Sequence, residues 1–222
     1  MSADHIRRLI VAVTGASGAP YAVHILKLLH SSPGYEAHLV ISSAGAVTLR
    51  HETRLKPNDL SALAAVTYRN SDIGAAIASG SFPTSGMIVA PCSIRTLAAV
   101  ANCDNSTLIA RAADVCLKEG RPLLLMVRET PLHKGHLRLM SEAADAGAII
   151  APPVPAFYAQ PRTIADLVDH TARRMLQRLG VSTLAPEPWS GLRHNGATWT
   201  ADDGPQLLHG RRKEGSDEPG RS

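Results

Sequence analysis

The sequence predicts an α/β protein in which a parallel sheet is covered by helices on both faces. Short apolar runs alternate along the chain with longer segments that have the period of an amphipathic helix. Apolar strands that alternate with helices are typical of a parallel sheet buried on both sides. The chain has 222 residues, of which 45% are hydrophobic, and this is enough for one domain with a sizeable core.

The expected elements follow one another in order along the chain. We expect strands at residues 9–13, 37–41, 65–68, 87–90, 122–127 and 148–150. We expect helices at residues 21–30, 44–51, 95–101, 107–118, 136–146 and 164–179. These elements predict a single domain over residues 1–190. Residues 191–222 are polar and rich in Gly, Asp, Arg and Glu, so we interpret them as a disordered tail without function.

Composition excludes several classes of partner. Aromatic residues make up only 4% of the chain, and the net charge of +4 forms no dense basic stripe, so we expect no nucleic-acid binding. A modest positive charge suits phosphorylated small molecules. The three cysteines fit no zinc spacing, which favours a reducing cytoplasm over secretion. No apolar stretch has the length of a membrane span.

Polar turns follow four of the predicted strands. In a parallel sheet, ligands collect at the carboxyl ends of the strands. This rule brings together TGASG at residues 14–18, ISS at 41–43, PCS at 91–93 and VRETP at 127–131. TGASG matches neither of the common nucleotide-binding fingerprints, and alone it is best interpreted as a tight turn in which Ser17 caps a helix. With Ser42 and Ser93, three hydroxyl-bearing turns share one rim, and this predicts a phosphate or flavin site.

Charged residues near the same rim are candidates for catalysis. A buried strand ends at Arg128, which offers a bidentate fork for phosphate, and Glu129, which could carry a proton. The alternative for this pair is a surface salt bridge. Arg111 and Lys118 are seven residues apart on one predicted helix and therefore share a face.

Other reactive side chains have plain structural alternatives. Tyr158 lies in a loop between prolines and is either a phosphate ligand or a loop anchor. Cys92 has no identifiable base beside it, and a buried free thiol is the more common outcome. His133 and His136 have no acidic or further His ligand at suitable spacing, so we expect no metal site.

Together these motifs resemble the UbiX-type flavin prenyltransferases. The match runs in order from about residue 9 to about residue 189 without a large gap. It includes TGASGAPYA, ISS, SGS, APCSIRTLAAVA, LIARAADVCLKEGRPLLLMVRETPLHKGHLRLM, AGAIIAPPVPAFYAQP and RRMLQRLG. The combination of RAADVCLKEGRPLLLMVRETP with PAFY is highly specific.

The resemblance implies a fold, a reaction and partners. Members of this family have a flavodoxin-like Rossmann fold and usually assemble as dodecamers. They join a dimethylallyl group from dimethylallyl phosphate to reduced FMN at N5 and C6, without a metal. The product, prenylated FMN, serves UbiD-type decarboxylases. The sequence does not decide between the monophosphate and the pyrophosphate as prenyl donor.

The resemblance also assigns roles to residues of this chain. The implied flavin contacts are Gly15, Ala16, Ser17, Ser42, Ser93, Ile94, Arg95, Thr96 and Arg128. The implied prenyl-phosphate ligands are Lys118, Arg128, Tyr158 and Arg174, the last in preference to Arg173. Glu129 matches the catalytic acid, and Ser17 is a candidate for the proton relay. The further polar and closing residues of the substrate site are Glu52, Arg111 and Trp189.

Two other functions compete with prenyl transfer. One is a flavin-dependent cysteine decarboxylase, which shares the fold and the FMN site. Such enzymes resemble one another in an Asn-containing motif where this chain has PCSIRT, and they do not account for the RET sequence. The other is a flavin carrier subunit without catalysis, which the set of Glu129, Lys118 and Arg174 argues against.

Overall fold

The computed structural model describes residues 6–181 and 184–186. The expected tail at residues 191–222 and the candidate Trp189 lie outside the described residues, and so does the end of the predicted domain. Among the residues described, no helix is long and apolar enough to cross a membrane.

One parallel sheet forms the centre of the fold. Its strands are β1 (Arg7–Val13), β2 (Tyr35–Ile41), β3 (Val66–Arg69), β4 (Gly86–Cys92), β5 (Leu123–Val127) and β6 (Ile149–Ile150). The strand order is β3-β2-β1-β4-β5-β6, and all neighbouring pairs are parallel. The predicted α/β class, with its flavodoxin-like Rossmann architecture, is confirmed.

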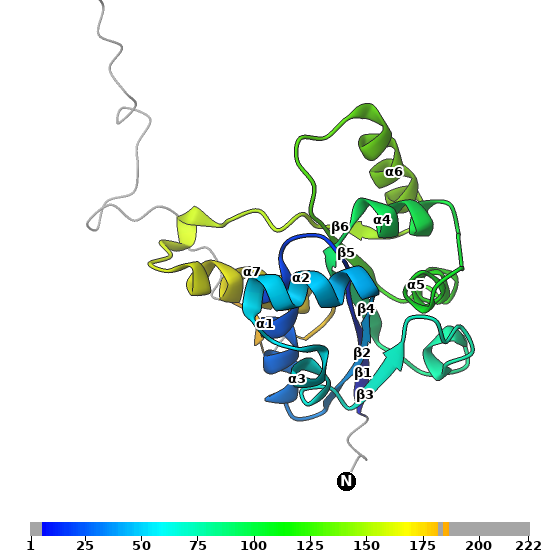
Figure 1. Cartoon of the computed structure of the whole chain (residues 1–222), viewed down its shortest axis with the longest axis horizontal. Coiled ribbons are helices and arrows are strands. Elements are labelled where there is room, and N and C mark those ends of the chain that lie inside the picture. The colour runs from blue at the N-terminus through cyan, green and yellow to red at the C-terminus, as the bar shows by residue number, and fades with distance from the viewer. Residues whose placement is uncertain (1–5, 182–183, 187–222) are drawn as a thin grey trace, which may run out of the picture. The chain divides into compact units, whose positions relative to one another are not determined.

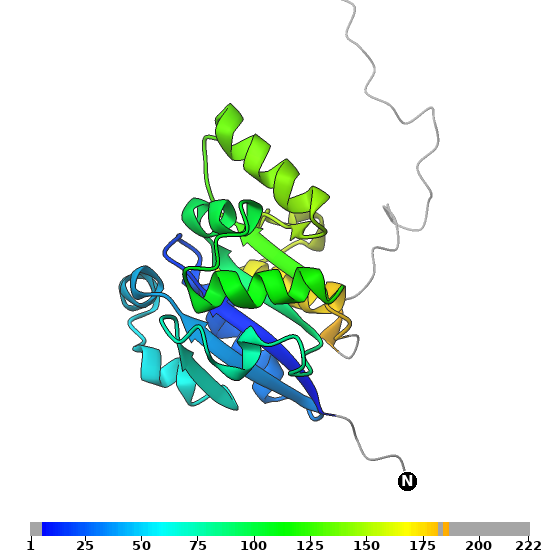
Figure 2. The same ribbon diagram turned by 90° about the vertical axis from the view of Figure 1, so that its right-hand side faces the viewer.

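Helices cover both faces of this sheet (Figures 1 and 2). The α-helices are α1 (Ala19–His30), α2 (Ser43–Thr53), α3 (Pro57–Ser61), α4 (Ile94–Ala101), α5 (Leu108–Lys118), α6 (Lys134–Asp145) and α7 (Ile164–Arg178). Two short 3-10 helices are η1 (Ala76–Ala78) and η2 (Phe157–Ala159). The helices α1, α2, α3 and α7 pack in one core, and α4, α5, α6 and η1 pack in the other.

The side-chain alternation of β1 explains these two cores. Leu9 and Val11 belong to the core beneath α1 and α7, whereas Ile10 and Ala12 belong to the core beneath α4 and α5. All four side chains are almost fully buried. Residues 9–13 of β1 are buried on both faces and are all apolar, as the sequence pattern predicts for such a strand.

The structure corrects several expected boundaries. The helices α3, η1 and η2 were not predicted, because segments of three to five residues have too few positions to show a helical period. Strand β4 continues through Pro91 and Cys92, past its expected end at residue 90. Its pairing with β5 shifts register between Val89 and Cys92, so a bulge accommodates the proline inside the sheet.

The chain reverses its direction of travel across the sheet between β1 and β4. Strands β1, β2 and β3 are added towards one edge, and the chain then returns to place β4 on the other side of β1. This switch point is where the carboxyl ends of two adjacent strands leave a crevice for a ligand. The turn after β1 is the TGASG segment. The turn after β4 begins at Ser93, the last residue of the PCS segment.

Candidate functional site

A cleft of about 710 Å³ opens at this rim of the sheet. Its lining includes Gly15, Ser42, Ser93, Arg95 and Thr96, all of them predicted site residues. The three turns identified separately in the sequence therefore form one site. The volume falls in the range of small-molecule and cofactor pockets.

Two helix N-termini offer backbone donors to this cleft. Ser42 and Ser93 cap α2 and α4 by accepting hydrogen bonds from the third amide of each helix, Gly45 N–H and Thr96 N–H. The first two amides of both helices make no hydrogen bond within the described part of the chain. Unpaired amides at a helix N-terminus attract an anion such as a phosphate.

The neighbouring helix α5 has no free amide at its N-terminus with which to bind an anion. Asn70 accepts hydrogen bonds from Leu108 N–H at 2.8 Å and from Ile109 N–H at 3.1 Å. The cap residue Thr107 accepts from Ala110 N–H at 3.3 Å. The first three amides of α5 are therefore already paired, so an anion in the cleft is directed towards α2 and α4.

Two glycines allow the backbone to close around the cleft. A Cβ atom on Gly15 would lie 2.4 Å from the Cβ of Ala44, so the turn after β1 passes directly against the first turn of α2. A Cβ on Gly45 would lie 2.5 Å from the carbonyl oxygen of Val13. Both contacts are too short for any side chain, and they fix the distance between these two walls.

Thr14 joins the turns after β1 and β4. Its hydroxyl donates to the Pro91 carbonyl at 2.7 Å and accepts from Ser93 N–H at 2.8 Å. The residue is 2% exposed, so these hydrogen bonds are shielded from water. Thr14 is a positioning residue that the sequence reasoning missed, since nothing local indicates partners almost eighty positions away.

Ser17 does not cap α1, contrary to the structural alternative considered from the sequence. Gly18 takes the cap position with a left-handed φ of 119° and provides no side chain. Glu52, from the end of α2, instead accepts hydrogen bonds from Gly18 N–H at 2.9 Å and Ala19 N–H at 2.8 Å. Its carboxylate occupies the positive end of α1.

Ser17 and Arg128 both lower the pKa of Glu52. Burial by itself raises the pKa of Glu52, but hydrogen bonds from the Ser17 hydroxyl and from the α1 amides outweigh it, together with the charge of Arg128. The net pKa is lowered, so the group remains an anion. The structure thus joins three residues that the sequence analysis assigned separately.

Arg128 and Glu129 leave the sheet beside the cleft wall. Arg128 N–H donates to the Cys92 carbonyl at 3.1 Å, so the end of β5 is tied to the end of β4. Both side chains are exposed. The Glu129 carboxylate accepts from the adjacent Thr130 N–H at 2.9 Å, and no salt bridge holds it among the described residues. The surface salt bridge considered for this pair does not form.

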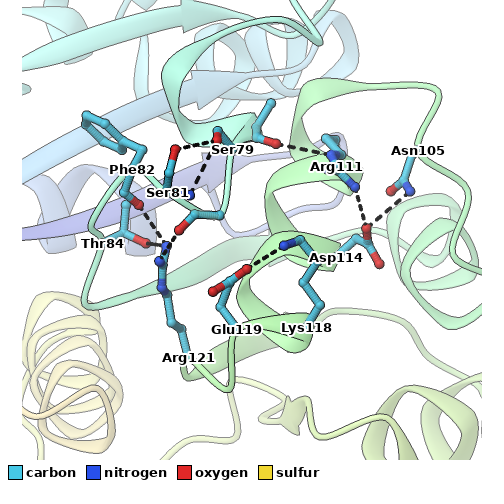
Figure 3. Close-up of polar contacts among 12 residues, drawn as sticks. Ser79, Ser81, Phe82, Thr84, Asn105, Arg111, Asp114, Lys118, Glu119 and Arg121 are labelled. Atoms are coloured by element: carbon cyan, nitrogen blue, oxygen red, sulfur yellow. Dashed lines mark hydrogen bonds and ion pairs between the residues drawn. The ribbon is translucent and has the colours of Figure 1, made fainter.

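Arg111 and Lys118 lie along α5, outside the residues that line the cleft (Figure 3). Arg111 donates to the Ala78 carbonyl and to Asp114. Lys118 pairs with Glu119 at the far end of the helix. The N-terminus of α5 borders the cleft, and its eleven residues span about 16 Å. Lys118 is therefore remote from the turns of its own chain at Gly15, Ser42 and Ser93.

Tyr158 lies against α7. Its ring meets His170 edge-on, with 5.6 Å between ring centroids. His170 is one helical turn before Arg174 and shares its face, so Tyr158 lies near the side of α7 that carries Arg174. Arg173 is held by Asp169 at 2.8 Å, whereas Arg174 donates to Gln177 and is exposed. This arrangement agrees with the preference for Arg174 over Arg173 as a ligand.

The remaining candidates have structural roles. Cys92 is fully buried, and burial raises the pKa of its thiol to about 12, so it remains protonated. His133 and His136 stack on one another with 3.6 Å between ring centroids. In residues 6–181 and 184–186, no group of three or more His, Cys, Asp or Glu side chains is placed to hold a metal ion.

The cleft also has a wall that the sequence reasoning did not identify. It consists of Asn70, Asn102, Asp104, Ser106 and Thr107. Asn70 directly follows β3, so the rule that found Ser42 and Ser93 could have found it as well. The segment between α4 and α5 carries no strand-end signal, and only the folded structure brings it to the rim.

Fold and site together define a flavodoxin-like α/β protein with a cleft at the switch point of its sheet, onto which two helix N-termini open. Residues 2–176 match the family model described as Flavoprotein. The chain belongs to this flavoprotein family and, within it, to the UbiX-type flavin prenyltransferases. The resemblance stated from the motifs is confirmed.

Individual relatives cover nearly all of the described chain. The flavin prenyltransferase UbiX of Salmonella typhimurium is 51% identical over 79% of this chain and 93% of its own length. The crystal structure of AnUbiX (PadA1) in complex with FMN and dimethylallyl pyrophosphate superposes with a TM-score of 0.81. It is 44% identical over 84% of this chain and 99% of that chain.

Two further solved structures bear on assembly and on the competing function. A dodecameric FMN-dependent UbiX-like decarboxylase from Escherichia coli O157:H7 has a TM-score of 0.80 and 43% identity, over 83% of this chain and 100% of its own. The FMN-dependent cysteine decarboxylase TvaF is only 15% identical, with a TM-score of 0.56, over 75% of this chain and 98% of its own. That likeness shows a shared fold and does not favour cysteine decarboxylation here.

Proposed function

We propose that the cleft binds FMN and that the chain transfers a dimethylallyl group from dimethylallyl phosphate to reduced FMN. The observation that carries this proposal is the cleft itself, in which three separate hydroxyl turns meet. The chain shares half its residues with flavin prenyltransferases over this region, which supports the same conclusion.

The chemistry of the cleft fits FMN. Its volume of about 710 Å³ suits a cofactor of this size. The free amides of α2 and α4, whose caps are Ser42 and Ser93, suit the phosphate. We assign Gly15, Ala16 and Ser17 to one side of the flavin. The residues that we assign to its other side are Ser93, Ile94, Arg95 and Thr96. Reduced FMN, when bound, supplies the nucleophilic atoms N5 and C6.

The cationic residues are assigned to the prenyl donor. As the bond between carbon and phosphate oxygen breaks, negative charge builds on the leaving phosphate. Arg128, Arg174, Lys118 and the Tyr158 hydroxyl would stabilise that charge. Trp189, which lies outside the described residues, is the candidate for closing the site and excluding water from the allylic cation.

We infer that Lys118 meets the turns around Gly15, Ser42 and Ser93 through a second copy of the chain. In one chain the far end of α5 is separated from the cleft by the length of the helix. A homo-oligomer in which α5 of one copy faces the cleft of another would complete the site. The dodecameric relative supports such an assembly, and we propose a dodecamer here.

We assign the proton transfer to Glu129, with Ser17 as the candidate for a relay. Glu129 is exposed beside Arg128 and has no competing ion pair in the described residues, so its carboxyl is available to a ligand. The Ser17 hydroxyl donates a hydrogen bond to Glu52, which leaves the serine oxygen free to accept a hydrogen bond from a ligand. The Glu52 carboxylate already accepts hydrogen bonds from the first amides of α1, so we assign it the role of holding this helix in position.

We place the protein in the cytoplasm, and we propose that its product is passed to a UbiD-type decarboxylase. The absence of a zinc or disulfide spacing among its cysteines supports the first point. Membership of the flavin prenyltransferases supports the second point, since a prenylated flavin that is released can serve another enzyme.

An anaerobic assay tests the proposed reaction. The full chain is mixed with reduced FMN and with either dimethylallyl phosphate or the pyrophosphate, and the flavin is analysed by mass spectrometry. We expect FMN carrying one C5 unit with the monophosphate. Unmodified FMN with both donors, under conditions in which the flavin is bound, would contradict the proposal.

A further inference from the structure

Three cations lie beside the segment of residues 78–84, and they are held in different ways (Figure 3). Arg111 donates to the Ala78 carbonyl at 3.2 Å. Arg121 donates to the carbonyls of Gly80 at 2.6 Å and Phe82 at 2.8 Å. Both guanidinium groups therefore fix the backbone of the segment and cannot leave it without unpairing buried or half-buried carbonyls.

Lys118 is held only by a carboxylate. In the part of the chain that the structure describes, its one polar partner is the neighbouring Glu119. Both side chains are partly exposed, at 45% and 34%. An exposed ion pair of this kind contributes little to stability, so Lys118 can exchange one anion for another.

The ion pair lies directly against the backbone of Gly80. A Cβ atom on Gly80 would lie 2.1 Å from Glu119 Oε1 and 2.7 Å from Lys118 Nζ. Arg121 donates to the Gly80 carbonyl, so the ion pair lies against a part of the backbone that is itself hydrogen-bonded. The Lys118 ammonium therefore lies beside the backbone of Gly80.

Glu119 is ionised in this arrangement. The hydrogen bond from Lys118 and the charge of Lys118 lower the pKa of the Glu119 carboxyl, and the charge of Arg121 lowers it further. Any phosphate that binds Lys118 must therefore displace a carboxylate that is negative at neutral pH.

We infer that Glu119 is a positioning residue that occupies Lys118 until the phosphorylated donor binds and reclaims it when phosphate leaves. The inference rests on the proposed role of Lys118 as a phosphate ligand. A prenyl phosphate brings apolar contacts that offset the lost ion pair, whereas free inorganic phosphate has none. Glu119 thus weakens the binding of inorganic phosphate and favours release of the phosphate formed in the reaction.

The test is a calorimetric titration of the FMN-saturated full chain with inorganic phosphate. In Glu119→Gln we expect phosphate to bind about fivefold more tightly, the factor for one unit charge about 4 Å away in water. The gain should vanish when Lys118→Met is present, because it acts through Lys118. Glu142→Gln removes a carboxylate from another exposed pair, with Arg138 at 2.7 Å, and should leave the affinity unchanged.

Three results would overturn the inference. They are equal or weaker phosphate binding by Glu119→Gln, an undiminished gain in the Lys118→Met background, and no measurable binding by either the wild type or Glu119→Gln. The titration requires no turnover. A failure of the proposed prenyl transfer would instead appear as unmodified FMN in the anaerobic assay, so the two failures are distinguishable.

Discussion

The Thr14 hydroxyl accepts a hydrogen bond from Ser93 N–H at 2.8 Å and joins the first strand's turn to the fourth strand's turn. The same hydroxyl donates to the Pro91 carbonyl at 2.7 Å. Donor and acceptor capacity are both used, so the two walls assigned to the flavin are held in one relative position. A preformed site of this kind lowers the cost of ordering on binding.

Thr14→Val should weaken FMN binding and destabilise the fold. Valine keeps the shape of threonine but leaves Ser93 N–H and the Pro91 carbonyl without this partner, at a cost of about 1–3 kcal/mol. Denaturant unfolding and a flavin fluorescence titration measure the two effects. Thr53→Val is the matched control, because the Thr53 hydroxyl bonds Leu49 and Leu55 at the end of α2. Equal effects in both variants would contradict the role of Thr14.

The contrast between Ser42 and Thr14 shows what the sequence can predict. Ser42 caps the helix that begins one residue later, and this local pattern is visible in the sequence. Thr14 bonds partners 77 and 79 positions away, and only the folded sheet brings them together. Strands and hydroxyl turns were therefore predictable, whereas the links between the turns were not.

The same distinction applies to Ser17 and Lys118. The turn around Ser17 was predicted at the rim, but its hydrogen bond to Glu52 depends on how α2 packs against α1. Lys118 was correctly placed on a helix, yet the sequence could not show that this helix carries it away from the cleft. Motif order along a chain does not reveal which copy of an oligomer supplies a residue.

Glu52→Gln should reduce stability at neutral pH by about 1 kcal/mol, the usual value for an anion at a helix N-terminus. The folded-state pKa of Glu52 is lowered from 4.5, so its contribution is present above pH 4.5 and is lost as the pH falls below that value. Urea unfolding between pH 7 and pH 3 tests this. The variant should lose less stability than the wild type below pH 4.5, and parallel curves would contradict the assignment.

His38 should make the free energy of unfolding depend on pH in a second range, above that of Glu52. Burial lowers its pKa from 6.5, Glu36 opposes the shift, and Arg8 adds to it. The Nδ1 atom lies 2.8 Å from the Tyr68 hydroxyl, and Nε2 has no hydrogen-bond partner within the described residues. As the pH falls, His38 is therefore protonated in the unfolded chain before it is protonated in the folded protein.

The stability associated with neutral His38 should be complete above about pH 6.5 and decrease as the pH falls through that value. Unfolding free energies measured between pH 8 and pH 5 should fall in the wild type and remain flatter in His38→Leu. The Glu52 effect lies at lower pH, so the two windows can be separated. An unchanged slope in His38→Leu would show that another group titrates.

Arg173 should contribute to the stability of the fold, whereas Arg174 should contribute to catalysis. Arg173 contacts Asp169, which also lies 2.7 Å from His24 on α1, so Arg173→Ala loosens the packing of α7 and should lower the melting temperature. Arg174 has only Gln177 as a partner in the described chain, so Arg174→Ala should leave the melting temperature unchanged. Its kcat/KM for the prenyl donor should fall at least about tenfold, the loss of one charge-assisted hydrogen bond. The reverse pattern would assign the phosphate to Arg173.

Glu129→Gln should retain FMN binding and slow turnover. The side chain is exposed and bonded only to its neighbour Thr130 in the described structure, so its loss disturbs no packing. Glutamine keeps the shape but cannot carry the proton, and general acid–base groups contribute about 10²–10⁴-fold in rate. Flavin fluorescence gives the affinity, and anaerobic single-turnover assays give the rate. Asp145→Asn, at the exposed end of α6, controls for the change in net charge. Wild-type rates in Glu129→Gln would remove Glu129 from the reaction and leave Ser17 as the remaining candidate for the proton transfer.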